Sequence, residues 1–126
     1  MQLPKLEAVD VVIFHNPCSD GFCAAWVIYN KFGSAVECLK GNYSEDRYDS
    51  GYWLGKVSGK RVVCVDFSFP RELTKELHAT AESFIVLDHH PSAEEELAGL
   101  DYCYIANDKS GAMMAWEACH GERPHP

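Results

Sequence analysis

Short apolar runs alternate with stretches of helical periodicity along the chain, and this alternation constrains the fold more than any other feature. Uninterrupted apolar runs are typical of strands that are buried on both faces. The predicted strands cover residues 9–14, 35–39, 61–65, 84–87 and 102–106. Strands that alternate with helices favour a parallel sheet. We therefore expect one three-layer α/β domain over residues 1–126, with a mostly parallel sheet of about five strands flanked by helices.

The helical segments are predicted from recurring apolar positions and from residues that begin or end helices. The first helix is expected to begin with Ser19 or Asp20 as its cap and to end at Gly33. One apolar stripe of this helix should face the core. That stripe consists of Phe22, Ala25, Trp26, Tyr29 and Phe32. Residues 41–59 carry several tyrosines and charges, and we expect them to form a surface loop.

Three further helices follow in the second half of the chain. Pro70 is expected at the first position of one helix. Ser92 and Glu95 have the spacing of a capping box, which predicts a short helix that ends near Gly99. The final helix should present one apolar face, formed by Ala112, Ala115, Trp116 and Cys119.

Composition and charge limit the classes of function. The 126 residues are 47% hydrophobic, enough for one domain with its own core. No apolar run approaches the ~20 residues that span a membrane, and the N-terminus lacks the pattern of a signal peptide. A net charge of −8 argues against binding of long duplex nucleic acid, although small anionic substrates suit a site that holds divalent ions. The six cysteines form no Cys-x-x-Cys pair, so we expect free thiols in a cytoplasmic protein.

Three of the apolar runs end in candidate metal ligands. His15 follows the first run, with Asp20 shortly after it, and Asp66 follows the run over residues 61–65. The run over residues 84–87 ends in Asp88, His89 and His90. The carboxyl ends of parallel strands meet at one edge of a sheet, where α/β proteins keep their ligand crevice. Imidazole and carboxylate ligands together suit Mn, Fe or Zn, and a carboxylate-rich set favours Mn. The alternatives are solvated strand ends and, for Asp20, a helix cap.

Four motifs in this order resemble those of the DHH phosphoesterases. They are His-Asn-Pro-Cys-Ser-Asp-Gly-Phe-Cys-Ala-Ala-Trp at residues 15–26, Val-Asp-Phe-Ser at 65–68, Asp-His-His at 88–90 and Ser-Gly-Ala at 110–112. The first two motifs are most similar to the branch described as oligoribonuclease-like or cyclic-nucleotide phosphodiesterase-like. Because the motifs extend across nearly the whole chain, the resemblance implies a DHH-type, Rossmann-like domain and a metal-dependent phosphoesterase.

The resemblance also implies roles for individual residues. Hydrolysis of a phosphate ester at neutral pH needs an activated nucleophile and nearby positive charge, and two metal ions ~3.5–4 Å apart supply both. A bridging carboxylate holds such a pair. The resemblance gives this role to Asp66, with His15 and Asp20 completing the site of the first ion. It gives the second ion to His89.

Further residues would act on the substrate or on the ligands. His90 resembles the family's phosphate-contacting histidine, and Asp88 is expected to orient an imidazole. Together with Asp66, these two are the candidate catalytic residues. Ser110 and Gly111 match the family's glycine-bearing turn, where backbone N–H groups at a helix N-terminus can bind an anion. The alternative is that Ser110 and Gly111 only cap the final helix.

The chain also departs from the family pattern. Phe22 stands where the wider family has a second aspartate, and Cys18 occupies a neighbouring position, where a thiolate would shift metal preference toward Zn or Fe. The family's fourth-motif aspartate and its C-terminal substrate domain would lie beyond residue 126. The chain is therefore expected to be a fragment, a naturally short protein, or one that completes its site as a homo-oligomer.

Two functions follow as expectations. The first is a phosphoesterase that acts on a small phosphorylated substrate, namely a short oligonucleotide, a cyclic mono- or dinucleotide, or a nucleoside bisphosphate. It would use one or two divalent ions, Mn in the first place, with Mg, Zn or Fe as alternatives. The second is a catalytically impaired metal-binding domain that acts through association with another protein. The complete set of His15, Asp20, Asp66 and His89 favours the first, and the short C-terminus favours the second.

Overall fold

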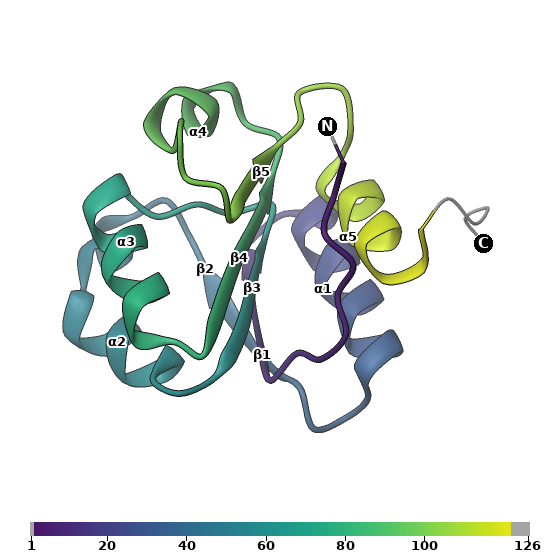
Figure 1. Ribbon diagram of the computed structural model, residues 1–126, viewed down its shortest axis with the longest axis horizontal. Coiled ribbons are helices and arrows are strands. Elements are labelled where there is room, and N and C mark those ends of the chain that lie inside the picture. The colour runs from purple at the N-terminus through teal and green to yellow at the C-terminus, as the bar shows by residue number, and fades with distance from the viewer. Residues whose placement is uncertain (1, 122–126) are drawn as a thin grey trace.

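A computed structural model describes residues 2–121, apart from the side chains of residues 45 and 46. Five parallel strands form one sheet in the order β2-β1-β3-β4-β5 (Figure 1). The strands are β1 (Val11–His15), β2 (Glu37–Gly41), β3 (Arg61–Val65), β4 (Ser83–Asp88) and β5 (Cys103–Ile105). The helices are α1 (Ser19–Phe32), α2 (Ser50–Val57), α3 (Arg71–Thr80), α4 (Pro91–Glu96) and α5 (Gly111–His120). The predicted three-layer α/β architecture is thus confirmed.

Helices cover both faces of the sheet, which explains why the central strands β1, β3 and β4 are mainly apolar. α1 and α5 lie on one face, and α2 and α3 lie on the other (Figure 1). In β1, Val12 and Phe14 pack into the α1 and α5 side, whereas Val11 and Ile13 pack into the α2 and α3 side. The central strands β1, β3 and β4 therefore contribute alternate side chains to two separate cores.

The strand order fixes where a ligand crevice can lie. β2 pairs with one edge of β1 and β3 pairs with the other, so the chain changes direction across the sheet at β1. In open α/β sheets, ligands bind outside the carboxyl ends of the strands at such a switch point. The residues that follow β1, β3 and β4 meet at this position.

Three of the five α1 residues that we expected in the core are exposed, so the prediction is wrong for these positions. Phe22 is 63% exposed, Trp26 is 51% exposed and Tyr29 is also exposed. The buried side of α1 instead carries small and aliphatic residues, namely Gly21, Ala24, Ala25, Val27 and Ile28. Small residues let α1 pack closely against the sheet and α5, so the bulky aromatic side chains lie on the outer side of the helix.

Residues 41–59 are not the surface loop that we expected. They contain a 3-10 helix (Glu45–Tyr48) and α2, whose Trp53 and Val57 are buried in the core beside α3. Asp49 caps α2, because its carboxylate accepts the Tyr52 N–H at 3.1 Å. This Asx cap, followed by apolar residues four positions apart, was a usable helix signal.

Three helices also begin at other residues than we predicted. Cys18 is the N-cap of α1, and it makes no side-chain cap bond. Pro70 is the N-cap of α3 rather than its first residue. α4 begins at Pro91, so Ser92 lies inside the helix and the predicted capping box is wrong. In α5, Ala115 and Cys119 are buried as expected, whereas Ala112 and Trp116 are half-buried.

All six cysteines are free, as the sequence predicted. Between residues 2 and 121, no helix is long and apolar enough to cross a lipid bilayer.

Candidate metal centre

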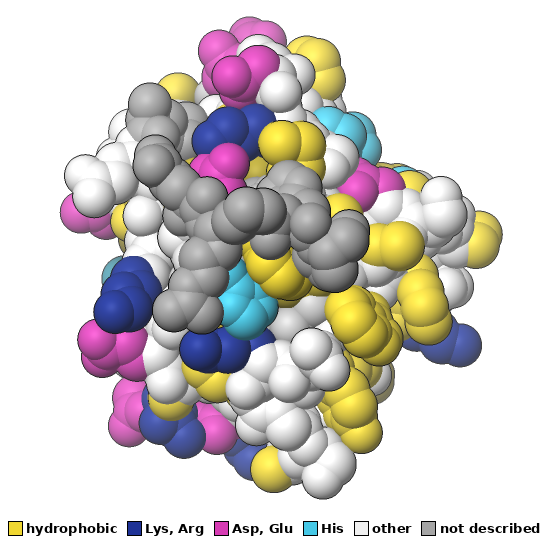
Figure 2. All heavy atoms as spheres, turned by 90° about the vertical axis from the view of Figure 1, so that its right-hand side faces the viewer, with side chains coloured by type: hydrophobic (Ala, Val, Ile, Leu, Met, Phe, Trp, Pro, Cys, Tyr) yellow, Lys and Arg dark blue, Asp and Glu magenta, His cyan; other side chains and the backbone are white. Residues whose placement is uncertain are grey.

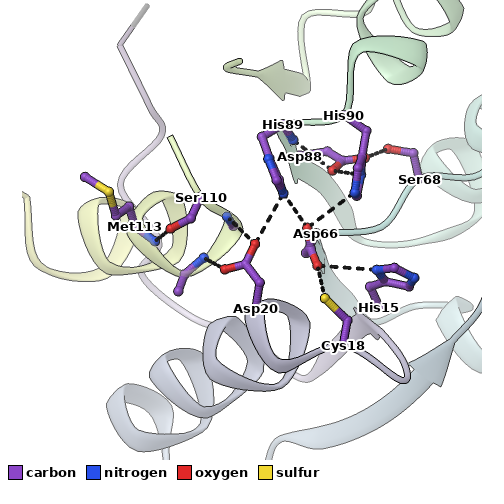
Figure 3. Close-up of polar contacts among 12 residues, drawn as sticks. His15, Cys18, Asp20, Asp66, Ser68, Asp88, His89, His90, Ser110 and Met113 are labelled. Carbon is purple, nitrogen blue, oxygen red and sulfur yellow. Dashed lines mark hydrogen bonds and ion pairs between the residues drawn. The ribbon is translucent and has the colours of Figure 1, made fainter. Parts of the chain in front are cut away.

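Asp66 lies at the centre of the cluster that the strand ends bring together. It follows β3 and its side chain is 1% exposed. Its Oδ1 atom lies 2.7 Å from Nε2 of His89. Its Oδ2 atom accepts the Cys18 thiol at 3.3 Å and lies 3.4 Å from Nδ1 of His15. The two oxygens of one carboxylate therefore face two different sets of side chains (Figure 3).

These sets form two groups with the spacing of metal ligands. One group is His15, Cys18 and Asp66, and the other is Asp66, Asp88, His89 and His90. In each group, ligand atoms from all members lie within 4.8 Å of one another. Because Asp66 belongs to both, the cluster can hold one metal ion or two that share its carboxylate.

Asp20 joins the His89 side of the cluster. Its Oδ2 atom lies 3.2 Å from Nε2 of His89. The same carboxylate accepts the backbone N–H groups of Gly111 at 2.9 Å and Ala112 at 3.0 Å. These donors form the first turn of α5, and the helix dipole there favours a negative charge. The structure thus places Asp20 with His89, whereas we expected Asp20 to complete the site of His15.

The turn at the start of α5 caps that helix and also donates a hydrogen bond to Asp20. Ser110 is the N-cap, and its hydroxyl accepts the Met113 N–H at 3.1 Å. Gly111 donates its own N–H to Asp20. Of the two roles that we considered for these residues, the cap is confirmed, and the N–H group of Gly111 is already occupied by a protein carboxylate. A side chain at position 111 would meet Asp66, because a Cβ atom there would lie 2.8 Å from Cβ of Asp66.

Asp88 is buried and holds the ring of His90. Nδ1 of His90 lies 2.7 Å from Oδ1 of Asp88, and the Ser68 hydroxyl donates to Oδ2 at 2.5 Å. Burial acts to raise the pKa of Asp88, but the contacts with His90, Ser68 and the His89 N–H outweigh it and lower the pKa. The bond to Asp88 in turn raises the pKa of His90. With Nδ1 held in this way, Nε2 of His90 faces the cluster, 3.8 Å from Oδ1 of Asp66.

The residues present fit a divalent metal ion. Nδ1 of His15 is buried and makes no hydrogen bond within the described residues, although Oδ2 of Asp66 lies 3.4 Å away. Buried polar atoms are nearly always paired, so this nitrogen lacks the partner that an ion would provide. Three carboxylates, those of Asp20, Asp66 and Asp88, also converge here and require compensating positive charge. Imidazole and carboxylate donors in this number suit a first-row divalent ion.

Gly21 sets the position of His15, and this yields a stability prediction. A Cβ atom at position 21 would lie 2.2 Å from the backbone oxygen of His15. Gly21→Ala should therefore lower the free energy of unfolding by about 3 kcal/mol, because backbone must move. The matched control is Gly55→Ala in α2, where an added Cβ would meet nothing within 4 Å. This control should raise stability by about 0.5–1 kcal/mol. Urea unfolding of both variants tests the comparison, and equal effects would contradict the close approach at Gly21.

Sequence reasoning missed one residue beside the cluster. The ring of Tyr43 lies with its centroid 5.0 Å from that of His15 and 5.9 Å from that of His90. Its hydroxyl accepts the Ser68 N–H at 3.2 Å. Tyr43 lies just after β2, in the segment that we expected to be a loop, and no motif in the sequence marked it.

Comparisons with known proteins find similarity in sequence and in fold to proteins that are themselves uncharacterized. No family model matches the chain. The chain is 32% identical over 131 residues to an uncharacterized protein of Acanthamoeba polyphaga mimivirus. This alignment covers 95% of this chain and 31% of the viral protein. The crystal structure of an uncharacterized protein from Helicobacter pylori G27 matches 88% of this chain and 36% of its own, with a TM-score of 0.72 and 16% identity. The structural match shows a shared fold, and this chain spans about a third of the length of either protein.

Proposed function

We propose that this chain is a divalent-metal-dependent phosphoesterase of the DHH type. The observation that carries the proposal is the Asp66 carboxylate, whose two oxygens face two separate groups of ligand atoms. A shared carboxylate between two ion sites is the arrangement that two-metal phosphoester hydrolysis uses. The four sequence motifs that resemble the DHH phosphoesterases supply the residues of this cluster.

Each side chain would have a distinct task in such a site. His15, Cys18 and Asp66 would hold one ion, and Asp66, Asp20 and His89 would hold the other. Bound divalent ions would supply an activated water nucleophile and positive charge for the phosphoryl oxygens. His90, held by Asp88, would present Nε2 to a phosphate oxygen. The first turn of α5 would keep the Asp20 carboxylate oriented toward His89 through two backbone N–H groups.

The donor set favours Mn, with Mg, Zn or Fe as alternatives. Hard carboxylate oxygens dominate on the side of His89, which suits Mn. The thiol of Cys18 lies on the side of His15, and a thiolate there would favour a softer ion such as Zn or Fe. We infer that the two sides differ in metal preference. The free thiols accord with a reducing compartment such as the cytoplasm.

The substrate would be a small phosphorylated molecule. The net charge of −8 disfavours long duplex nucleic acid, whose affinity depends on many cationic contacts. A short oligonucleotide, a cyclic mono- or dinucleotide, or a nucleoside bisphosphate needs cationic charge only at the site itself, where bound ions would supply it.

A Mn titration tests the proposal. We expect hydrolysis of a dinucleotide to be weak at trace Mn and to rise steeply with added Mn, because the side of His15 has a thiol in place of a second carboxylate and should therefore bind Mn last. Initial rates and bound Mn, measured at the same concentrations, should show turnover that follows the second equivalent of metal rather than the first. A rate that saturates with the first equivalent would contradict the two-ion arrangement.

A second candidate function, that of a catalytically impaired metal-binding domain that acts through association with another protein, is favoured by one observation. Apolar side chains gather over the outer side of α1 and α5 (Figure 2). They include Phe22, Trp26, Tyr29 and Met113, all exposed. Monomeric proteins rarely expose large contiguous apolar patches. Sedimentation equilibrium tests the case in which the partner is a second copy of this chain, because a chain that stays monomeric at high micromolar concentration would contradict self-association.

A further inference from the structure

A pocket of about 300 Å³ lies beside the metal centre. Tyr43, Arg47 and Tyr48 line it together with Ser68, which follows β3, and Glu96, which ends α4. Its size is at the lower end of the range for small-ligand sites. The carboxylate of Glu96 accepts the backbone N–H of Arg71 at 2.8 Å, so this acidic group already has a partner.

Arg47 supplies the positive charge of this pocket. Its guanidinium carbon lies 4.9 Å from the ring centroid of Tyr43 and 5.0 Å from that of Tyr48. Nη2 donates to the Tyr48 hydroxyl at 2.8 Å, whereas Nε has no hydrogen-bond partner within the described residues. None of the acidic side chains that the structure describes forms an ion pair with Arg47. A guanidinium with five N–H donors therefore keeps donors for an anion.

Tyr43 and Ser68 connect this pocket to the metal centre. The ring of Tyr43 lies edge-on to both His15 and His90, and the guanidinium of Arg47 lies over the same ring. The backbone N–H of Ser68 donates to the Tyr43 hydroxyl, and the hydroxyl of the same residue donates to Asp88 (Figure 3 shows the latter contact). One molecule that extends across the exposed ring of Tyr43 would thus contact the metal centre at one end and Arg47 at the other.

We propose that Arg47 binds a second phosphate group of the substrate, distinct from the phosphate that is hydrolysed. This inference rests on the proposed function, because it assigns the hydrolysed phosphate to the metal centre. Arginine pairs with phosphate through two parallel N–H donors, and the position of the Arg47 guanidinium over two tyrosine rings, with its bond to the Tyr48 hydroxyl, limits its orientation. The substrate then carries at least two phosphates, as a phosphorylated dinucleotide or a nucleoside bisphosphate does.

The test compares binding of dinucleotides that differ only in a terminal phosphate. Phosphorothioate-linked diadenosine, which resists hydrolysis, is titrated by calorimetry in the presence of Mn, with no terminal phosphate, with one at the 5′ end or with one at the 3′ end. Wild type should bind at least one of the phosphorylated forms about tenfold or more tightly than the unphosphorylated form. Arg47→Gln should bind all three forms alike. Arg47→Lys, which keeps the charge and loses the planar fork, should retain part of the preference.

Lys56→Gln is the matched control. Lys56 also lies over a tyrosine ring, 5.6 Å from the centroid of Tyr52, but it does not line this pocket. This variant should keep the full preference. Equal binding of the three forms by wild type, an unchanged preference in Arg47→Gln, or a similar loss in Lys56→Gln would overturn the inference, as would failure of wild type to bind any of them. Hydrolysis of bis(p-nitrophenyl) phosphate, which has a single phosphate, tests the proposed function separately.

Discussion

Replacing Asp66 with asparagine is expected to weaken Mn binding by more than about 100-fold. This loss of affinity exceeds the roughly 10- to 100-fold that follows substitution of a residue that only holds a ligand in place. Each oxygen of Asp66 faces one of the two ligand groups, so asparagine, which keeps a single oxygen, removes a ligand atom from one side and the negative charge from both. Asparagine is the appropriate substitution because Asp66 has a φ of 57°. Asparagine tolerates this left-handed conformation, whereas alanine would add about 1–2 kcal/mol of backbone strain.

Titration calorimetry with Mn measures this effect. Asp101→Asn is the matched control, since Asp101 is exposed and belongs to neither ligand group. The control should bind Mn with the affinity of wild type. Thermal unfolding in the presence of a chelator should show that Asp66→Asn is folded. Wild-type Mn affinity in this folded variant would contradict the assignment of Asp66 as the shared ligand.

Replacing His90 with alanine is expected to lower turnover by about 100-fold or more while leaving the metal content nearly unchanged. Asp88 holds Nδ1 of His90 at 2.7 Å, and Nε2 is thereby directed toward the cluster without reaching hydrogen-bond distance of Asp66. A histidine held in this way suits contact with a phosphate oxygen. The variant should therefore lose a substrate contact rather than an ion.

Two measurements separate this role from that of a ligand. Metal analysis of the purified variant should give the Mn content of wild type, and steady-state kinetics should give the reduced turnover. His78→Ala is the control, because His78 is exposed on α3, where it stacks on Tyr102. A His90→Ala variant that loses half or more of its Mn would show that His90 is itself a ligand.

The placement of the site followed from the sequence because it depends on local features. The apolar runs marked strands, and the residue types at the carboxyl ends of three of them marked candidate metal ligands. Topology then brought His15, Asp66 and His89 together, since β1, β3 and β4 are neighbours in the sheet. The partner of Asp20 depends instead on how α5 docks against α1. The sequence motifs do not encode that distance, so the grouping of Asp20 with His89 required the structure.

The orientation of α1 shows the same limit. Periodicity marks two apolar faces of this helix, one with Trp26 and one with Ala24, Val27 and Ile28. Hydrophobicity alone favours the larger side chains for the core, but the approach of Gly21 to the backbone of His15 turns the small residues inward. Similarly, α2 contains two glycines, which lower its helix propensity, although Trp53 and Val57 anchor it in the core.

The most direct measurement of the central claim is hydrolysis of bis(p-nitrophenyl) phosphate at saturating Mn by wild type and by Asp66→Asn, with bound metal determined in the same samples. The proposed function predicts turnover by wild type that disappears in Asp66→Asn together with the bound Mn. Wild type that is folded and fully loaded with Mn, yet releases no p-nitrophenol and cleaves no dinucleotide or cyclic dinucleotide, would contradict it.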